Sequence, residues 1–287
     1  MLSCIFIYLA YKLSTIGWAN IFKSLPTSPL FYVLALVFVS LPIITEKIVF
    51  GIATDTKFVP PFKMFIRKHV INKAVMNYAG EGYFVKRLSD FEAFDLRSAA
   101  IIVKNLTLAR AFAANFWIIL LVLAALMFGN ANVFHKMTLV SPVLVAAVSV
   151  ICVGVCAGAV IFFQRLTSLD WGVAGKMCSL YLFRSFLAAC VLITQWSIVI
   201  PGTVLSVWLL FLTVFFISKK SPIGGDLVFV SVALTLPGLE DQSAAVAAML
   251  LMNAAILQLL YSLGFVFTSE FSDKKNPEIL KGVPNIN

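Results

Sequence analysis

Long apolar runs with almost no charge constrain this chain more than any other feature of its sequence. Six of them approach or exceed the roughly 18 residues that an α-helix needs to cross the hydrocarbon core of a bilayer. They do not alternate apolar with polar residues, as membrane-spanning strands do. The chain is 61% apolar and 12% charged, whereas soluble domains are about 45–50% apolar. We therefore expect an all-α integral membrane protein, folded as a polytopic helical bundle. The six expected spans are residues 30–52, 97–128, 138–163, 177–200, 203–218 and 244–268.

A polar, glycine-bearing stretch at residues 78–87 interrupts this apolar background and recurs in a weaker form. A shift of 145 positions superimposes the two copies, with the aligned pairs Gly80/Gly225, Glu81/Asp226, Phe84/Phe229 and Val85/Val230. This spacing predicts an internal repeat within a single membrane domain. Its halves would be residues 14–128 and 177–268, joined by the span at 138–163 and followed by a flexible polar tail at 269–287.

Two half-length segments stand beside these glycine-acid turns. Residues 62–77 are amphipathic and residues 227–236 are apolar, and each is too short to cross the bilayer. We expect both to be re-entrant or broken helices. Together with a partial segment at 2–13, the chain would then have about six to eight spans. Broken helices leave backbone N–H and C=O groups without partners, and in lipid these must face a polar cavity or a ligand. The pattern predicts a central polar cavity whose helix N-termini, beside Lys and Arg, attract phosphate.

Charged and amide side chains near these turns form the candidate site. A charged side chain within the bilayer costs at least about 2.5–3.5 kcal/mol and is usually paired or functional. We expect Glu81 and Asp226 to act as gates or as partners of a headgroup amine, and Arg67 and Lys68 to recruit lipid from the cytoplasmic leaflet. The predicted headgroup-binding residues are Gly80, Glu81, Lys86, Arg87, Asn115, Gly224, Gly225, Asp226 and Asn253.

Structural ion pairing is the alternative interpretation of the same charges. In this interpretation Glu81 pairs with Lys86 or Arg87. In the headgroup hypothesis, Lys86 and Arg87 instead bind the lipid phosphate. Arg184, inside an apolar run, then pairs elsewhere and holds helices together. Near the end of the first span, the adjacent pair at 46–47 (Glu-Lys) is typical of an anchor at the membrane interface.

Charge balance and motifs exclude several functional classes. Lys and Arg number 22 against 13 Asp and Glu, an excess that indicates a cytoplasmic face and anionic lipid, and not nucleic acid. The sequence lacks GxSxG, HExxH, Walker and Rossmann motifs, and His69 and His135 have no carboxylates at ligand spacing. We expect no enzyme activity, no metal and no cofactor, with membrane lipids as partners. A small-residue face at 154–158 favours close helix packing and leaves a homodimer open.

Two composite motifs are built around the glycine turns. The first joins Gly80-Glu81, Lys86-Arg87-Leu88 and Ser98-Ala99-Ala100, and the second joins residues 222–226 (Pro-Ile-Gly-Gly-Asp), Gly238-Leu239 and residues 243–248. Over residues 14–268, they resemble the lysylphosphatidylglycerol synthase transmembrane-region (flippase-like domain) family. Ile223 interrupts the Pro-Gly-Gly of that family, and the family's following glutamate is absent here.

The resemblance implies a polytopic protein of the bacterial inner membrane that moves lipids between leaflets, without the aminoacyl-transferring domain of some family members. The expected function is therefore non-enzymatic translocation of an anionic or phosphate-bearing lipid. Two alternatives stay open. One is a membrane scaffold or accessory protein of a lipid or glycan pathway, in which the charges are structural pairs. The other is an ion-coupled transporter of a small polar solute, whose cavity would be closed to lipid.

Overall fold

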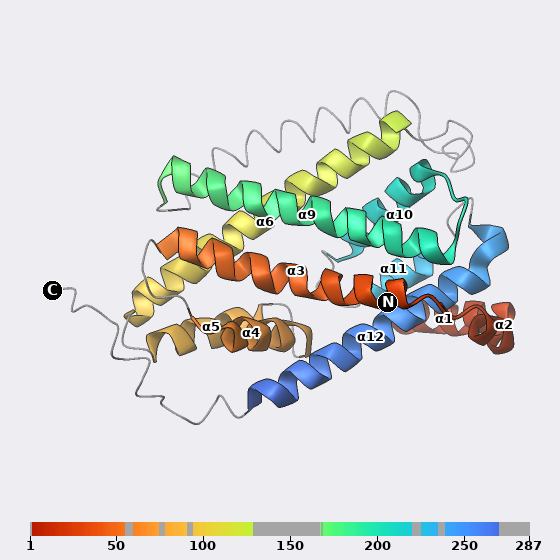
Figure 1. Cartoon of the computed structure of the whole chain (residues 1–287), viewed down its shortest axis with the longest axis horizontal. Coiled ribbons are helices and arrows are strands. Elements are labelled where there is room, and N and C mark those ends of the chain that lie inside the picture. Colours follow the sequence, from red (N-terminus) through yellow and green to blue (C-terminus); the bar gives the residue numbers. More distant parts are fainter. Residues whose placement is uncertain are drawn as a thin grey trace. The chain divides into compact units, whose positions relative to one another are not determined.

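A computed structural model of the chain describes residues 2–54, 60–74, 78–90, 94–128, 167, 169–219, 225–234 and 239–269. Every regular element in these ranges is a helix, as the sequence predicts (Figure 1). The α-helices are α1 (Leu2–Ile16), α2 (Trp18–Lys23), α3 (Pro29–Thr54), α4 (Phe62–Ala74), α5 (Ala79–Ser89), α6 (Leu96–Phe128), α9 (Trp171–Val199), α10 (Leu205–Ser218), α11 (Gly225–Ala233) and α12 (Ser243–Ser269). A short 3₁₀-helix, η1 (Glu240–Gln242), precedes α12.

Four of the described helices are long and apolar enough to cross a membrane. They are α3, α6, α9 and α12, with candidate spans of 26, 30, 29 and 26 residues. About 20 helical residues suffice for the hydrocarbon core. These helices coincide with four of the expected spans, and the fold is consistent with an α-helical integral membrane protein. The span expected at 138–163 lies outside the described residues, and α10 has only 14 residues. The total number of spans and the re-entrant segments stay predictions.

Local sequence signals fix several helix ends. Asp95 precedes α6 and its Oδ1 accepts a hydrogen bond from the Ser98 N–H at 3.2 Å. Asp170 precedes α9 and its Oδ2 accepts from the Gly172 N–H at 3.0 Å. Such side chains satisfy N–H groups that the first helical turn leaves free. Between α9 and α10, Gly202 has φ 83°, a left-handed conformation that glycine adopts readily, so the expected Pro-Gly turn is confirmed.

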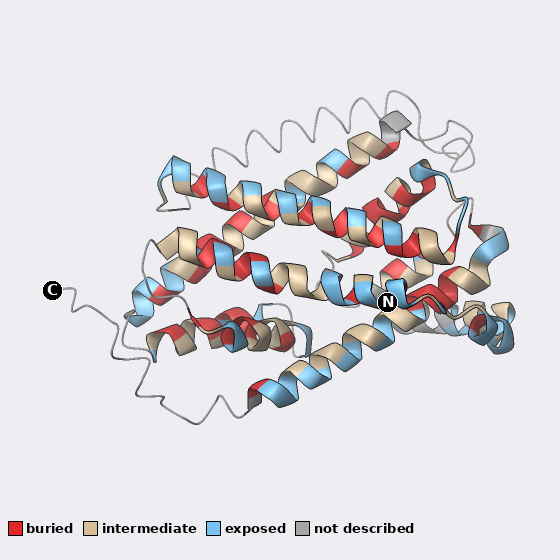
Figure 2. Ribbon diagram, in the orientation of Figure 1, coloured by how far each residue is buried: buried red, intermediate tan, exposed pale blue. Residues whose placement is uncertain are grey.

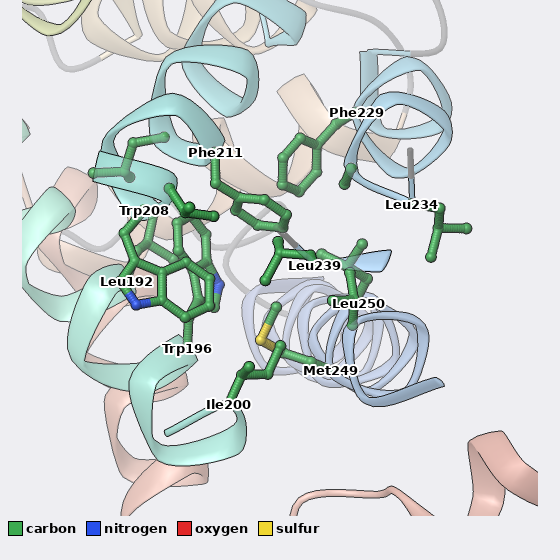
Figure 3. Close-up of a cluster of buried hydrophobic side chains, with 14 of the residues drawn as sticks. Leu192, Trp196, Ile200, Trp208, Phe211, Phe229, Leu234, Leu239, Met249 and Leu250 are labelled. Atoms are coloured by element: carbon green, nitrogen blue, oxygen red, sulfur yellow. The ribbon is translucent and has the colours of Figure 1, made fainter. Parts of the chain in front are cut away.

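The chain divides into two compact units, each with a hydrophobic core of its own. Unit 1 draws on residues 1–38, 115–160 and 185–256, and unit 2 on 39–114, 161–184 and 257–287. In unit 1, Trp196, Phe211 and Phe229 form a chain of edge-on aromatic contacts, with ring centroids 4.6 Å and 5.1 Å apart (Figure 3). In unit 2, Phe65 and Phe84 pack at a centroid distance of 5.1 Å. Such aromatic pairs add stability beyond their burial.

The aligned glycine turns occupy similar places in the two units. Gly80 is the second residue of α5 and Gly225 the first of α11, and each of these short helices precedes a long one, α6 or α12. Phe84 and Phe229, four residues after the glycines, are both buried in the core of their unit. Since α3, α6, α9 and α12 contribute residues to both units, the units do not coincide with the predicted repeat halves. The repeat itself stays a prediction.

The long helices carry apolar side chains on their exposed faces. On α12, the residues Leu259, Leu263, Phe265, Val266 and Phe267 are all exposed, and Figure 2 shows pale-blue positions along this helix. Contiguous exposed apolar surface marks a binding partner or a membrane. On a helix of spanning length, lipid is the partner that this surface fits.

Candidate functional site

The α4–α5 hairpin builds the candidate site by bringing two helices into backbone contact. A Cβ added to Gly80 would lie 2.1 Å from the Lys68 carbonyl oxygen, so that only glycine fits there. The Gly80 N–H donates to Asn72 Oδ1 at 2.7 Å, which satisfies an N–H at the start of α5. Tyr78, just before α5, turns the chain with φ 74°. This close approach places Glu81 of α5 beside Lys68 of α4.

Four charged side chains from four helices meet here, in what we call the ion network: Glu46 of α3, Lys68 of α4, Glu81 of α5 and Arg110 of α6. Lys68 Nζ lies 2.5 Å from Glu46 Oε1, and Arg110 Nη2 lies 2.6 Å from Glu81 Oε1. Two longer contacts close the ring, Lys68 Nζ to Glu81 Oε1 at 3.8 Å and Arg110 Nη1 to Glu46 Oε1 at 3.6 Å. Opposite charges therefore alternate around the network.

The ion network is largely removed from solvent. The side chains of Lys68, Glu46, Glu81 and Arg110 are 0%, 3%, 10% and 21% exposed. The Lys68 ammonium also lies over the Phe84 ring, 4.9 Å from its centroid. Moving a charge out of water costs several kcal/mol per ion, and close pairing offsets that cost. Loss of any one member would leave its closest partner charged and buried, with only the longer of its two ion contacts.

Titration of the hairpin residues follows from this arrangement. Burial alone would raise the pKa of the Glu81 carboxyl, but the positive charges of Arg110 and Lys68 lower it below its ordinary value. Glu81 is therefore ionised at neutral pH. Burial lowers the pKa of His69 to about 4, with Glu46 opposing the shift and nearby cations adding to it. His69 is therefore neutral at pH 7, and its Nδ1 is buried without a hydrogen-bond partner among the described residues.

Two further guanidinium groups in unit 2 have aromatic neighbours and no carboxylate partner within the described ranges. The Arg67 guanidinium carbon lies 5.1 Å from the Phe265 ring centroid and 6.0 Å from that of Tyr83, and its Nη1 is buried without an acceptor. Arg184 lies over the Tyr181 ring at 5.4 Å. It is close enough to the ion network to interact with the charges of Glu46 and Arg110. Unit 2 thus holds more cationic than anionic charge away from water.

The structure corrects two structural interpretations of the sequence. Glu81 pairs with Lys68 and Arg110, and not with Lys86 or Arg87. Lys86 is exposed, and Arg87 lies 3.5 Å from Asp90 near the surface. These two residues follow Glu81 on the same short helix, at positions that do not face it.

The second correction concerns Glu46, which is not an interface anchor. It is buried in the ion network, whereas the neighbouring Lys47 points to the Phe62 ring, 5.7 Å from its centroid. Adjacent residues of a helix point in different directions. The two charges are neighbours in sequence, but the helix gives them separate surroundings.

Other predicted site residues are distributed over both units. Asn115 is exposed on the part of α6 that belongs to unit 1. Asn253, also in unit 1, forms an amide pair with Gln195. Gln195 Nε2 donates to Asn253 Oδ1 at 2.9 Å and to the Phe31 carbonyl at 3.0 Å. Gly224 lies outside the described residues, and Asp226 is in the first turn of α11. The headgroup roles of these residues stay predictions.

Sequence reasoning missed Glu46 and Arg110 as members of the site. Both carry a signal that was present in the sequence, namely a charge in or next to an apolar run of spanning length. Their partners lie on other helices, however, and sequence spacing does not identify such partners.

Comparison with known proteins adds no further assignment. No protein-family model, curated protein or solved structure matches the chain. The resemblance to the lysylphosphatidylglycerol synthase family therefore stays a prediction from the two motifs. Within the part of the chain that the structure describes, no three His, Cys, Asp or Glu side chains are placed to hold a metal ion.

Proposed function

We propose that this chain moves an anionic, phosphate-bearing lipid between the leaflets of the bacterial inner (cytoplasmic) membrane, without enzymatic chemistry. The observation that carries the proposal is the excess of cationic charge in unit 2. Among its described buried and half-buried side chains there are six cations (Lys47, Arg67, Lys68, Arg87, Arg110 and Arg184) and two carboxylates (Glu46 and Glu81), and Arg87 has a further partner in the exposed Asp90. Charges at membrane depth are costly unless they are paired or functional. A lipid headgroup is the anion that a bacterial membrane supplies in quantity.

The ion network and the unpaired arginines have different roles in this proposal. The network is internally balanced and holds α3, α4, α5 and α6 together, so it forms the frame of the site. Arg67 and Arg184 lack carboxylates in the described ranges and are free to engage a phosphate through their planar N–H donors. Acyl chains remain in the bilayer while the headgroup charge is neutralised at the protein. Re-entrant packing of α4, α5 and α11 would place their ends near the midplane.

The test is lipid movement by the purified chain in liposomes. Phosphatidylglycerol with a fluorescent acyl chain is incorporated, and dithionite then reports how fast inner-leaflet lipid reaches the outer leaflet. We expect the wild-type protein to accelerate this movement, and Arg184→Gln to slow it by about tenfold, equivalent to about 1.4 kcal/mol. Arg97→Gln is the matched control, because Arg97 is exposed at the start of α6. If liposomes with the wild-type protein moved the lipid no faster than protein-free liposomes, the proposal would be rejected.

A membrane scaffold or accessory protein is the second candidate function, and the balance of the ion network favours it. Four charges that neutralise one another across four helices can serve only to hold those helices together. In that case Arg184 is a half-buried, unpaired cation with no ligand. Arg184→Met would then raise the free energy of unfolding, since apolar replacements of poorly compensated buried charges are often stabilising. The translocator proposal instead requires that Arg184→Met slows lipid movement.

A further inference from the structure

The surroundings of Arg67 come from three helices of unit 2. It lies on α4, and its two aromatic neighbours, Tyr83 and Phe265, lie on α5 and α12. A guanidinium within about 6 Å of a ring centroid gains cation–π attraction, which grows when the site is desolvated. The rings therefore hold the guanidinium in place while its N–H groups remain the part that can recognise a ligand.

Helix α12 packs closely against α4 beside Arg67. A Cβ added to Gly264 would lie 3.1 Å from Val70 Cγ2 and 3.4 Å from Ile66 Cγ2. The α12 backbone thus lies directly against α4, on residues one position before and three positions after Arg67. Phe265, the residue after Gly264, is brought to the guanidinium by this contact.

One donor of Arg67 lacks an acceptor. Its Nη1 is buried and donates to no acceptor among the described residues. Arginine stays charged in proteins, and leaving a buried charged donor unsatisfied is expensive. The two buried carboxylates nearby, Glu46 and Glu81, are engaged by Lys68 and Arg110. An anion from outside this set, with oxygens that fit a planar guanidinium, such as a phosphate, would supply the missing acceptor.

The neighbourhood of the site indicates that this phosphate belongs to a lipid. From Phe265, the exposed face of α12 continues through Leu259, Leu263 and Val266, all apolar. A phosphate at Arg67 would thus have an apolar surface for acyl chains beside it. Inorganic phosphate has no acyl chain that could cover this surface. We infer that Arg67, held by Tyr83 and Phe265, binds the phosphate of a lipid headgroup whose acyl chains lie along α12. This inference rests on the proposed function, for which it names the headgroup contact.

Binding to the full chain in non-ionic detergent tests the inference. The probes are dioctanoyl phosphatidylglycerol, dioctanoylglycerol, which has the same chains without phosphate, and inorganic phosphate, each titrated by calorimetry. We expect Arg67→Gln to bind the phospholipid at least about tenfold more weakly than wild type. Arg67→Lys, which keeps the charge and loses the two-pronged donor, should also bind more weakly and covers the case in which the Gln variant does not fold. Arg97→Gln should bind like wild type.

Several outcomes would overturn the inference. Equal phospholipid affinity in wild type and both Arg67 variants would remove Arg67 from the site. Equal affinity of wild type for phosphatidylglycerol and inorganic phosphate would show a phosphate site without a lipid component. A third outcome concerns the chain itself, because Glu270 and Asp273 follow α12 in the sequence. If the Glu270→Gln/Asp273→Asn double variant bound the phospholipid and wild type did not, the partner of Arg67 would be a carboxylate of the chain.

Binding and movement separate this inference from the proposed function. Arg67-dependent phospholipid binding by a protein that moves no lipid would reject translocation and keep the site. Lipid movement by wild type with unchanged binding in the Arg67 variants would reject the site and keep translocation.

Discussion

At the scale of single residues, charge pairing inside unit 2 decides both stability and the proposed chemistry. Each carboxylate of the ion network has one oxygen engaged by cations, while Glu46 Oε2 and Glu81 Oε2 are buried without hydrogen-bond partners in the described part of the chain. The network is therefore satisfied in charge and incompletely satisfied in hydrogen bonds. Removing a single member should be far more damaging than removing a pair.

Lys68→Met tests this directly. The substitution leaves Glu46 buried without its 2.5 Å partner, and we expect the free energy of unfolding to fall by about 3–5 kcal/mol. Adding Glu46→Gln to Lys68→Met should recover part of that loss, because the poorly compensated Glu46 charge is then gone. The measurement is unfolding by sodium dodecyl sulfate in mixed micelles, with Lys63→Met at an exposed position of α4 as the control. Additive losses in the double variant would argue against a coupled network.

The pH dependence of stability should report on His69. Its pKa is lowered to about 4 in the folded chain, against about 6.5 when unfolded. Between these values the unfolded chain binds a proton that the folded chain does not, so stability falls as the pH is lowered. The window from about pH 6.5 to 4.5 isolates His69, because the Glu81 carboxyl, with its lowered pKa, contributes only below its ordinary range. Thermal unfolding in this window should show a decline in wild type that His69→Gln removes, and an identical decline in both would contradict the assignment.

At the scale of elements, the α4–α5 hairpin is the part on which the site depends most. Its geometry comes from one glycine, since the Gly80 position has no room for a Cβ beside the Lys68 carbonyl. The same contact sets the position of Glu81 and, through Lys68, that of Glu46. A change at Gly80 should therefore be transmitted to the whole ion network.

Gly80→Ala should destabilise the protein by at least about 2 kcal/mol, because the added methyl would lie 2.1 Å from the Lys68 carbonyl oxygen. Gly82→Ala on the same helix is the matched control, since a Cβ there meets nothing within 4 Å. It should be neutral or stabilise α5 by up to about 1 kcal/mol through helix propensity. The measurement is the free energy of unfolding of both variants in mixed micelles. Equal effects at the two glycines would contradict the close contact.

Elements were also the level at which the sequence was most informative. The apolar runs at 30–52, 177–200 and 244–268 predicted α3, α9 and α12 well, because their length and composition leave few alternatives. The amphipathic pattern at 62–77 predicted α4. The partners of Glu81 were not predictable, because Lys68 and Arg110 reach it through tertiary packing. Periodicity identifies a helix face and does not say which other helix covers it.

At the scale of the whole molecule, four long helices contribute residues to both units, and each unit has its own core. At 1.5 Å per residue, the 14 residues of α10 rise about 21 Å, which falls short of a hydrocarbon core about 30 Å thick. Its role as a sixth span, like the internal repeat and the re-entrant packing of α4, α5 and α11, stays a prediction. The charge excess in unit 2 is the feature that connects this helical frame to an anionic lipid.

The preference of the reconstituted protein for anionic lipid tests the central claim most directly. The measurement compares the rates at which wild-type liposomes move fluorescent phosphatidylglycerol and fluorescent phosphatidylcholine between leaflets, with protein-free liposomes as the baseline. Because cations outnumber carboxylates at the site, we predict that the anionic lipid moves about tenfold faster, a difference of about 1.4 kcal/mol. Equal rates for the two lipids, or rates no higher than the baseline, would contradict the account.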